Sequence, residues 1–222
     1  MASVVIFGTG KIAQVAHACL SDEHDVVGFT VDRAYLDPSP PTPLPVVAFD
    51  DVVERFPPAE VRMFVAMGYH DLNAVRAARL AQAAALGYGF VSWVSPRASI
   101  GKGVEIGANC LVMPQASVQP FARLEDGVFV WDNAVIGHHA HIGAHCWITA
   151  GAVVASSVGL GAECFLGANA VIVNEVTVGR RCLIGAGALV SAAAADNGVY
   201  VAPGTERLRL DSDRFLKISK MR

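Results

Sequence analysis

The sequence predicts a small α/β domain followed by a parallel β-helix built from six-residue repeats. Counting in sixes from Ile100, each of the sixteen positions up to Val190 is aliphatic, with no phase slip. Before this repeat, strand-like and helix-like segments alternate along the chain, which is typical of a parallel sheet with helices on its faces. A fixed period of this kind indicates a solenoid, so the repeat decides the fold of the second half.

The first domain, residues 1–94, is expected to contain strands at 4–7, 26–31, 62–67 and 88–93 and helices at 13–20 and 71–86. A proline-rich loop at 37–45 precedes a short helix capped by Asp50. The turn Gly8-Thr9-Gly10-Lys11-Ile12-Ala13 lies between a strand and a helix, the context in which a glycine-rich turn binds phosphate. The alternative is that its glycines only make a tight turn.

Asp32 follows the second strand, where an acid often binds a ribose hydroxyl. The domain holds about one mononucleotide-binding half, and a full dinucleotide domain needs two. A redox enzyme that uses NAD is therefore not expected.

Each hexapeptide should form one short strand and one turn, and three should close a triangular coil with the aliphatic side chain inside. The residue two before each aliphatic is small, and four of the five cysteines occupy this slot. We expect these cysteines to be core residues. Glycine follows the aliphatic at eight sites, where it should relieve turns with unusual backbone angles. The β-helix should span 95–203, with a tail at 204–222 that caps its open end.

Composition excludes several classes of function. The net charge of −3 gives no electrostatic case for nucleic acid, and no apolar run approaches a membrane span. The N-terminus lacks the features of a signal peptide, so we expect a cytoplasmic protein. Four histidines gather at 138, 139, 141 and 145, but their spacing does not suit zinc, and no metal is expected.

The repeat over residues 98–190 resembles the hexapeptide-repeat acyltransferases, which form left-handed β-helices. A small Rossmann-like domain before such a helix resembles one subfamily, the N-acetyltransferases of nucleotide-linked amino sugars and the sialic-acid O-acetyltransferases. The resemblance runs from Val4 to about Pro203 and includes the ending Gly198-Val199-Tyr200-Val201-Ala202-Pro203. It implies a homotrimer, with acetyl-CoA as co-substrate in the cleft between neighbouring β-helices and no metal cofactor. It also implies a nucleotide-sugar held by the first domain through Gly8, Gly10, Lys11, Ile12, Asp32 and Gly68.

The same resemblance places the general base on His138, since imidazole titrates near neutral pH. The family's acidic helper falls on His139, and a second family histidine falls on Trp147. An asparagine of the family falls on Trp131, although the adjacent Asp132 and Asn133 are able to orient His138 instead. The sugar-contacting Gly-Gly-His turn is replaced by Gly10-Lys11-Ile12.

The implied contacts with acetyl-CoA are Trp147, Ser156, Ala168, Ala186, Arg180 and Arg181. The two arginines form the only basic pair in the repeats, where they either meet the phosphates of CoA or form a solvated corner. The two tryptophans are expected on the outer surface, lining the cofactor cleft or packing against another subunit.

Together these observations predict an acetyl-CoA-dependent acyltransferase that acts on an amino or hydroxyl group of a nucleotide-linked sugar. Three alternatives stay open: an acyltransferase for another small acceptor, a β-helix binding module without activity, and a γ-carbonic anhydrase. The last needs three metal-binding histidines at matched corners, and the histidines here do not supply an obvious set.

Overall fold

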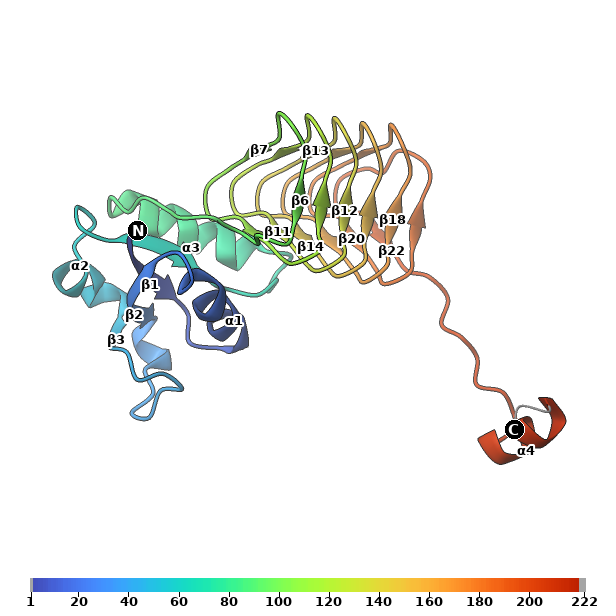
Figure 1. Cartoon of the computed structure of the whole chain (residues 1–222), viewed down its shortest axis with the longest axis horizontal. Helices are drawn as coiled ribbons and strands as arrows, with labels where there is room; N and C mark the ends of the chain where they lie inside the picture. The colour runs from blue at the N-terminus through green and yellow to red at the C-terminus, as the bar shows by residue number, and fades with distance from the viewer. Residues whose placement is uncertain (1, 220–222) are drawn as a thin grey trace.

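The computed structural model describes residues 2–219 of the 222-residue chain. An α/β region lies at one end of a long β-helix, and a C-terminal segment leads away from the other end (Figure 1). Met1 and residues 220–222, which fall in the predicted first domain and tail, lie outside the described residues. Within residues 2–219, no helix has the length and apolar character needed to cross a membrane.

The α/β region is built on a four-stranded parallel sheet of order β3-β2-β1-β4. Its strands and helices, with two 3₁₀ turns, are β1 (Ser3–Phe7), α1 (Lys11–Leu20), β2 (Asp25–Val31), η1 (Arg33–Tyr35), β3 (Val46–Ala48), η2 (Phe49–Asp51), α2 (Val52–Arg55), β4 (Arg62–Val65) and α3 (Ala74–Ala85). Alternate residues of β1 enter two separate cores, because side chains of a strand point to opposite faces. One core contains α1 and the β-helix, and the other contains α2 and α3.

Three details of this region differ from the sequence prediction. The predicted strand at 88–93 does not join this sheet: Phe90 alone bridges to Met63, and Trp93 belongs to a strand of the β-helix. The fourth strand of the sheet is β3, which is too short for its alternation to be recognised. Helix α3 begins at Ala74 and not at residue 71, because the three preceding residues have positive φ angles of 47°, 46° and 71°. Asp50 caps no helix, since its carboxylate pairs with Arg33.

The β-helix consists of three parallel sheets, which is consistent with the predicted left-handed type. We call the seven-stranded sheet the covered face: β5 (Trp93–Val94), β8 (Leu111–Val112), β11 (Phe129–Val130), β14 (Trp147–Ile148), β17 (Phe165–Leu166), β20 (Leu183–Ile184) and β22 (Val199–Tyr200). The second face has six strands: β6 (Ser99–Ile100), β9 (Ser117–Val118), β12 (Val135–Ile136), β15 (Val153–Val154), β18 (Val171–Ile172) and β21 (Leu189–Val190). The third face has five: β7 (Glu105–Ile106), β10 (Arg123–Leu124), β13 (His141–Ile142), β16 (Gly159–Leu160) and β19 (Thr177–Val178).

The chain visits the covered, second and third faces in turn, so the prism has three corners. We call the corner between the second and third faces the far corner, because in a triangular section it lies opposite the covered face. Each corner turn places one residue in the left-handed region, such as Asn133, His139 and His145.

The interior of the prism is the predicted aliphatic core. Fourteen of the sixteen repeat positions are buried, and Ile142 has no exposed surface. Ile100, in the first coil, is 40% exposed. The four cysteines of the small slot are buried and free, as expected.

The glycines that follow the aliphatic residues have a different role from the predicted one. Gly137 does not have a positive φ; instead, a Cβ at this position would overlap the backbone nitrogen of Ser156 in the next coil. A Cβ at Gly143 would lie 2.6 Å from the nitrogen of Ala162. These glycines therefore allow coils to approach closely, and the left-handed residue comes two positions later.

Aromatic side chains of the covered face pack against the α/β region. Phe129 stacks on Phe64 with 5.8 Å between ring centroids, and Tyr69 lies 5.3 Å from Trp147 and 4.6 Å from Phe165. Trp147 points away from the prism as predicted, but it is only 3% exposed. The covered face is thus the surface on which the first region sits.

The C-terminal segment carries α4 (Ser212–Ser219), which has no buried residue. Leu208, Leu210, Phe215, Leu216 and Ile218 are all exposed, and the segment extends away from the last coil (Figure 1). A capping role for this tail stays a prediction, and in the single chain the segment does not lie on the β-helix.

Candidate functional site

A pocket of about 410 Å³ opens in the α/β region beside the carboxyl ends of β1, β2 and β4. Its lining contains every residue that the sequence analysis assigned to the sugar substrate: Gly8, Gly10, Lys11, Ile12, Asp32 and Gly68. The carboxyl ends of parallel strands form the usual ligand-binding edge of an α/β sheet. The fold therefore brings the predicted substrate residues together in one place.

The two glycines of the first turn have separate roles. Gly8 has a φ of 112°, and a Cβ there would lie 3.0 Å from the carbonyl oxygen of Ala66, so this position requires glycine for the fold. A Cβ at Gly10 would meet no atom within 4 Å, so its small size leaves open space beside α1. The first turn of α1 carries no acid, and Lys11 is exposed there. A helix N-terminus of this kind attracts phosphate through its free N–H groups and its dipole.

The carboxylate of Asp32 is fixed by Arg79 from α3. The two side chains form an ion pair of 2.7 Å, and the Arg79 guanidinium lies over the rings of Phe7 and Phe49. The Asp32 side chain stays 38% exposed at the pocket. It is therefore oriented and still able to accept a hydrogen bond from a ligand hydroxyl.

His138 and His139 lie together in the far corner, in the turn between β12 and β13. Their Nδ1 atoms are 3.1 Å apart, and both side chains are exposed. The backbone N–H of His138 donates to Oε1 of Gln119 at 3.1 Å, and the His139 ring packs on Phe121 at 5.0 Å between centroids. The predicted base thus has an open imidazole in a supported turn.

The other two clustered histidines are directed elsewhere on the same coil. His141 lies on the third face, where its Nε2 contacts Glu125 at 2.8 Å. His145 is partly buried at the corner between the third and covered faces, and burial and the charge of Arg76 lower its pKa. Within residues 2–219, no group of three or more His, Cys, Asp or Glu side chains could hold a metal ion.

Asp132 and Asn133 do not orient His138. They belong to the turn between β11 and β12, at the corner between the covered and second faces. His138 is in the far corner, so the suggestion that these side chains replace the family's asparagine is wrong. The nearest supporting amide is that of Gln119, one coil earlier.

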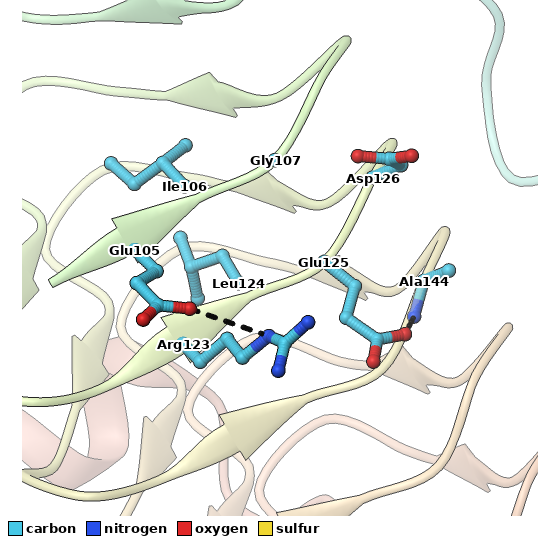
Figure 2. A pocket seen from close by; sticks show the side chains of 8 residues that line it. All are labelled: Glu105, Ile106, Gly107, Arg123, Leu124, Glu125, Asp126 and Ala144. Carbon is cyan, nitrogen blue, oxygen red and sulfur yellow. Dashed lines mark hydrogen bonds and ion pairs between the residues drawn. The ribbon is translucent and has the colours of Figure 1, made fainter.

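An acidic pocket that the sequence analysis missed lies on the third face (Figure 2). It has a volume of about 310 Å³ and contains the Glu105–Arg123 pair, 3.6 Å apart. Glu125 accepts a hydrogen bond of 2.9 Å from the backbone N–H of Ala144 and also contacts His141. Most of its polar groups are already paired within the chain.

The residues predicted to hold acetyl-CoA are not gathered in one chain. Ser156 lies in the far corner, in the coil after His138, whereas Ala168 and Ala186 lie in turns between the covered and second faces. Two neighbouring chains would be needed to bring these corners to one cleft.

Three other residues predicted to contact the cofactor already have partners within the chain. Arg181 is held by Glu163 at 2.8 Å and by Asp71 at 3.0 Å, and Arg180 also lies 3.6 Å from Glu163. Acids of the same chain therefore already balance this basic pair. Trp147 is covered by Tyr69 and the α/β region, so its ring is not open to a ligand.

Several lining residues of the first pocket escaped the sequence analysis. They are Phe7, Thr9, Val31, Tyr35, Ala66, Met67 and His70. Most lie within a few residues of a strand end, so the rule for parallel sheets could have indicated them. Gln119 and Phe121 support the histidine pair from the preceding coil. Because successive coils are eighteen residues apart, an alignment of the coils could have indicated these contacts.

Comparison with known proteins agrees with this architecture. The profile of the family described as bacterial transferase hexapeptide (six repeats) matches residues 157–192. No curated protein sequence matches the chain significantly.

Solved structures of two proteins span nearly the whole chain. The acetyltransferase domain of PglB from Neisseria gonorrhoeae is 26% identical, with a TM-score of 0.77 over 90% of this chain and 96% of that one. The same domain has been solved in complex with acetyl coenzyme A, at 26% identity and a TM-score of 0.77 over 89% and 94% of the two chains. PerB from Caulobacter crescentus, in complex with CoA and GDP-perosamine, shares the fold at 24% identity, with a TM-score of 0.79 over 92% and 98%.

These comparisons show which proteins the chain is similar to. The chain carries the hexapeptide repeat of bacterial transferases and, over nine-tenths of its length, the fold of an acetyltransferase domain. The resemblance to the hexapeptide-repeat acyltransferases that the sequence indicates is confirmed.

Proposed function

We propose that the chain transfers the acetyl group of acetyl-CoA to an amino group of a nucleotide-linked sugar, with His138 as the general base. The observation that carries the proposal is the first pocket, where all six predicted substrate residues meet in a chain with the fold of an acetyltransferase. We interpret the α/β region as a Rossmann-like domain that binds the nucleotide of the acceptor.

The chemistry of the pocket suits a nucleoside diphosphate. The N-terminus of α1 and Lys11 supply positive potential for the diphosphate, and Gly10 lets it approach the backbone. Asp32, oriented by Arg79, accepts a hydrogen bond from a ribose hydroxyl. Lys11 and Ile12 replace the sugar-contacting turn of the family, so an acceptor other than an amino sugar is the second candidate.

In the reaction, the acceptor nitrogen attacks the carbonyl carbon of the thioester, and Nε2 of His138 takes a proton from that nitrogen. Backbone N–H groups stabilise the negative charge that develops on the carbonyl oxygen. The new C–N bond stays, the C–S bond breaks, and the departing thiolate recovers the proton from His138. The products are the acetylated amine and free CoA, and His138 returns to its starting state.

One chain is not sufficient for this reaction. The pocket is flanked by Tyr69, which packs on Trp147 of the covered face, whereas His138 lies in the opposite, far corner. The body of the β-helix therefore separates the acceptor pocket from the base of the same chain. A homotrimer resolves this separation when the pocket of one chain faces the far corner of its neighbour.

The same arrangement suits acetyl-CoA, the second substrate. Ser156 lies one coil beyond His138, where the backbone N–H of Ser157 donates to the carbonyl of His138 at 2.9 Å. Ala168 and Ala186 of the neighbouring chain would form the other wall of the cleft. Small side chains at these positions leave backbone groups open to the pantetheine amides.

The test is an acetyl-transfer assay with a panel of nucleotide-linked amino sugars that differ in nucleotide and in amine position. Free CoA thiol and the acetylated product are measured together, with free amino sugars and simple amines as comparison acceptors. We expect turnover with one class of nucleotide-linked amino sugar. Hydrolysis without product, or equal turnover of simple amines, would contradict the proposed acceptor.

A further inference from the structure

The two imidazoles of the far corner make a contact that limits where their protons can lie. The Nδ1 atoms of His138 and His139 are 3.1 Å apart, and the ring planes are nearly perpendicular, at 89°. His139 is able to face its neighbour in this way with a positive φ of 59°. Two ring nitrogens at this distance form a hydrogen bond only when one carries a proton and the other accepts it.

With both rings neutral, two arrangements satisfy this condition. In the first, His138 donates from Nδ1, so its Nε2 carries a free lone pair, and His139 carries its own proton on Nε2. In the second, His139 donates from Nδ1 and His138 must carry its proton on Nε2. Only the first arrangement leaves a basic nitrogen of His138 open to an acceptor amine.

Contacts with neighbouring residues hold the His139 ring beside His138. Its ring packs on Phe121 at a tilt of 40°, and its backbone N–H donates to the carbonyl of Pro120 at 3.2 Å. Phe121 is itself tied to the coil below, because its N–H donates to the carbonyl of Lys102 at 3.1 Å. The Nδ1 atom of His139 therefore belongs to a ring that contacts with two coils hold in place.

Neither imidazole has a carboxylate as its ion-pair partner within residues 2–219. The charged groups on the adjoining third face are engaged in other pairs, Glu105 with Arg123 and Glu125 with His141. In the turns of this corner two coils away on either side, the exposed charged side chains are Lys102 and Glu175, and neither forms an ion pair with His138 or His139. The role that a carboxylate plays beside many catalytic histidines therefore falls on a neutral ring.

We propose that His139 is a positioning residue that accepts the Nδ1 proton of His138 and so keeps Nε2 of His138 free as the base. This inference rests on the proposed function of the same corner. During turnover His138 gains the acceptor's proton on Nε2, keeps its Nδ1–H donated to His139, and passes the Nε2 proton to the thiolate. No ring has to turn, and the proton count of His139 does not change.

The proton positions can be measured without any substrate. Long-range ¹⁵N–¹H spectra of the histidine rings distinguish protonated from bare nitrogens, and single-site variants assign each ring. Above the titration range of imidazole, we expect His138 to be protonated at Nδ1 and bare at Nε2, with His139 bare at Nδ1. A wild-type His138 that is protonated at Nε2, or a His138 tautomer that is unchanged in His139→Phe, would overturn the proposal whether or not the enzyme activity is found.

Kinetics then separate positioning from a structural role. His139→Phe keeps a ring against Phe121 but offers no acceptor, and should lower kcat about 10- to 100-fold with little change in KM. His139→Asp restores an acceptor in a side chain that tolerates positive φ, and should keep most of kcat. Because a carboxylate favours protonated His138, the acid limb of the kcat/KM profile should move to higher pH. Equal losses in both variants, with no movement of this limb, would overturn the proposal.

A matched control comes from the same coil. His141→Phe removes an exposed imidazole two residues away that already has a carboxylate partner and does not contact His138. It should leave kcat and the pH profile unchanged. If His141→Phe moves the acid limb of the kcat/KM profile as far as His139→Asp does, this limb does not report on the contact between His138 and His139, and the inference fails.

Discussion

The guanidinium of Arg76 donates a hydrogen bond of 2.6 Å to the backbone carbonyl of His145, joining α3 to a corner of the β-helix. Arg76 is completely buried, lies over the rings of Phe129 and Trp147, and also donates to Asn73 at 3.1 Å. Burial without a carboxylate lowers its pKa to about 10. The α/β region therefore packs on the β-helix around one desolvated cation.

Replacing this side chain should show which property matters. Arg76→Ala removes the packing and leaves a cavity and two unpaired acceptors, so it should lower the free energy of unfolding by about 2–4 kcal/mol. Arg76→Met keeps most of the volume without a buried charge, and should lose less than half as much. Urea unfolding measures both. A Met variant as unstable as the Ala variant would mean that the hydrogen bonds, and not the packing, hold the contact.

The buried ring of His145 should make stability depend on pH. Burial lowers its pKa in the folded state below the ordinary value of 6.5, so protonation favours the unfolded chain. The stability that the neutral His145 ring contributes is fully present above pH 6.5. It is lost as the pH falls from there through the lower pKa of the folded state. His145→Asn should flatten this part of the curve, because asparagine occupies the equivalent left-handed corner position at Asn109. An unchanged slope in urea midpoints would contradict the assignment.

The repeat could be predicted because its period is short and every coil requires an aliphatic residue at the same inward positions. The inward positions follow from counting alone, as Ile136, Ile142 and Ile148 show. The first pocket was predictable for a similar reason, since a glycine turn and Asp32 mark strand ends that a parallel sheet brings together.

Other features depend on contacts that no local pattern records. Trp147 carries an outward side chain in any single coil, and the docking of the α/β region, with Tyr69 and Arg76 against its ring, covers it. The pairing of Arg181 with Asp71 joins positions 110 residues apart. The position of α3 depended on three left-handed residues that the apolar periodicity does not reveal.

The two glycines of the first turn should respond differently to a side chain. Gly10→Val adds atoms in open space beside α1, so the protein should fold normally while KM for the nucleotide-linked acceptor rises and KM for acetyl-CoA stays the same. Gly8→Val is the comparison: it forces a β-branched residue into a φ of 112° and should destabilise the fold. Equal increases in both KM values for Gly10→Val would mean that this pocket does not hold the acceptor.

A site shared between chains should be restored by mixing two variants that are each impaired in one half of the site. A chain with His138→Ala keeps its pocket, and a chain with Gly10→Val keeps its base. In co-expressed trimers of random composition, roughly one quarter of the sites should combine an intact pocket with an intact base from the neighbour. Mass spectrometry confirms mixing. Mixed trimers with no activity beyond that of the parents would place both groups in the same chain's site.

Replacement of His138 tests the proposed function most directly. With the acceptor identified by the assay above, steady-state kinetics of His138→Ala should show kcat lowered by about 10²- to 10⁴-fold and both KM values nearly unchanged, as expected when a general base is removed and binding is kept. A His138→Ala enzyme with near-normal turnover would contradict the assignment of the far corner as the catalytic site.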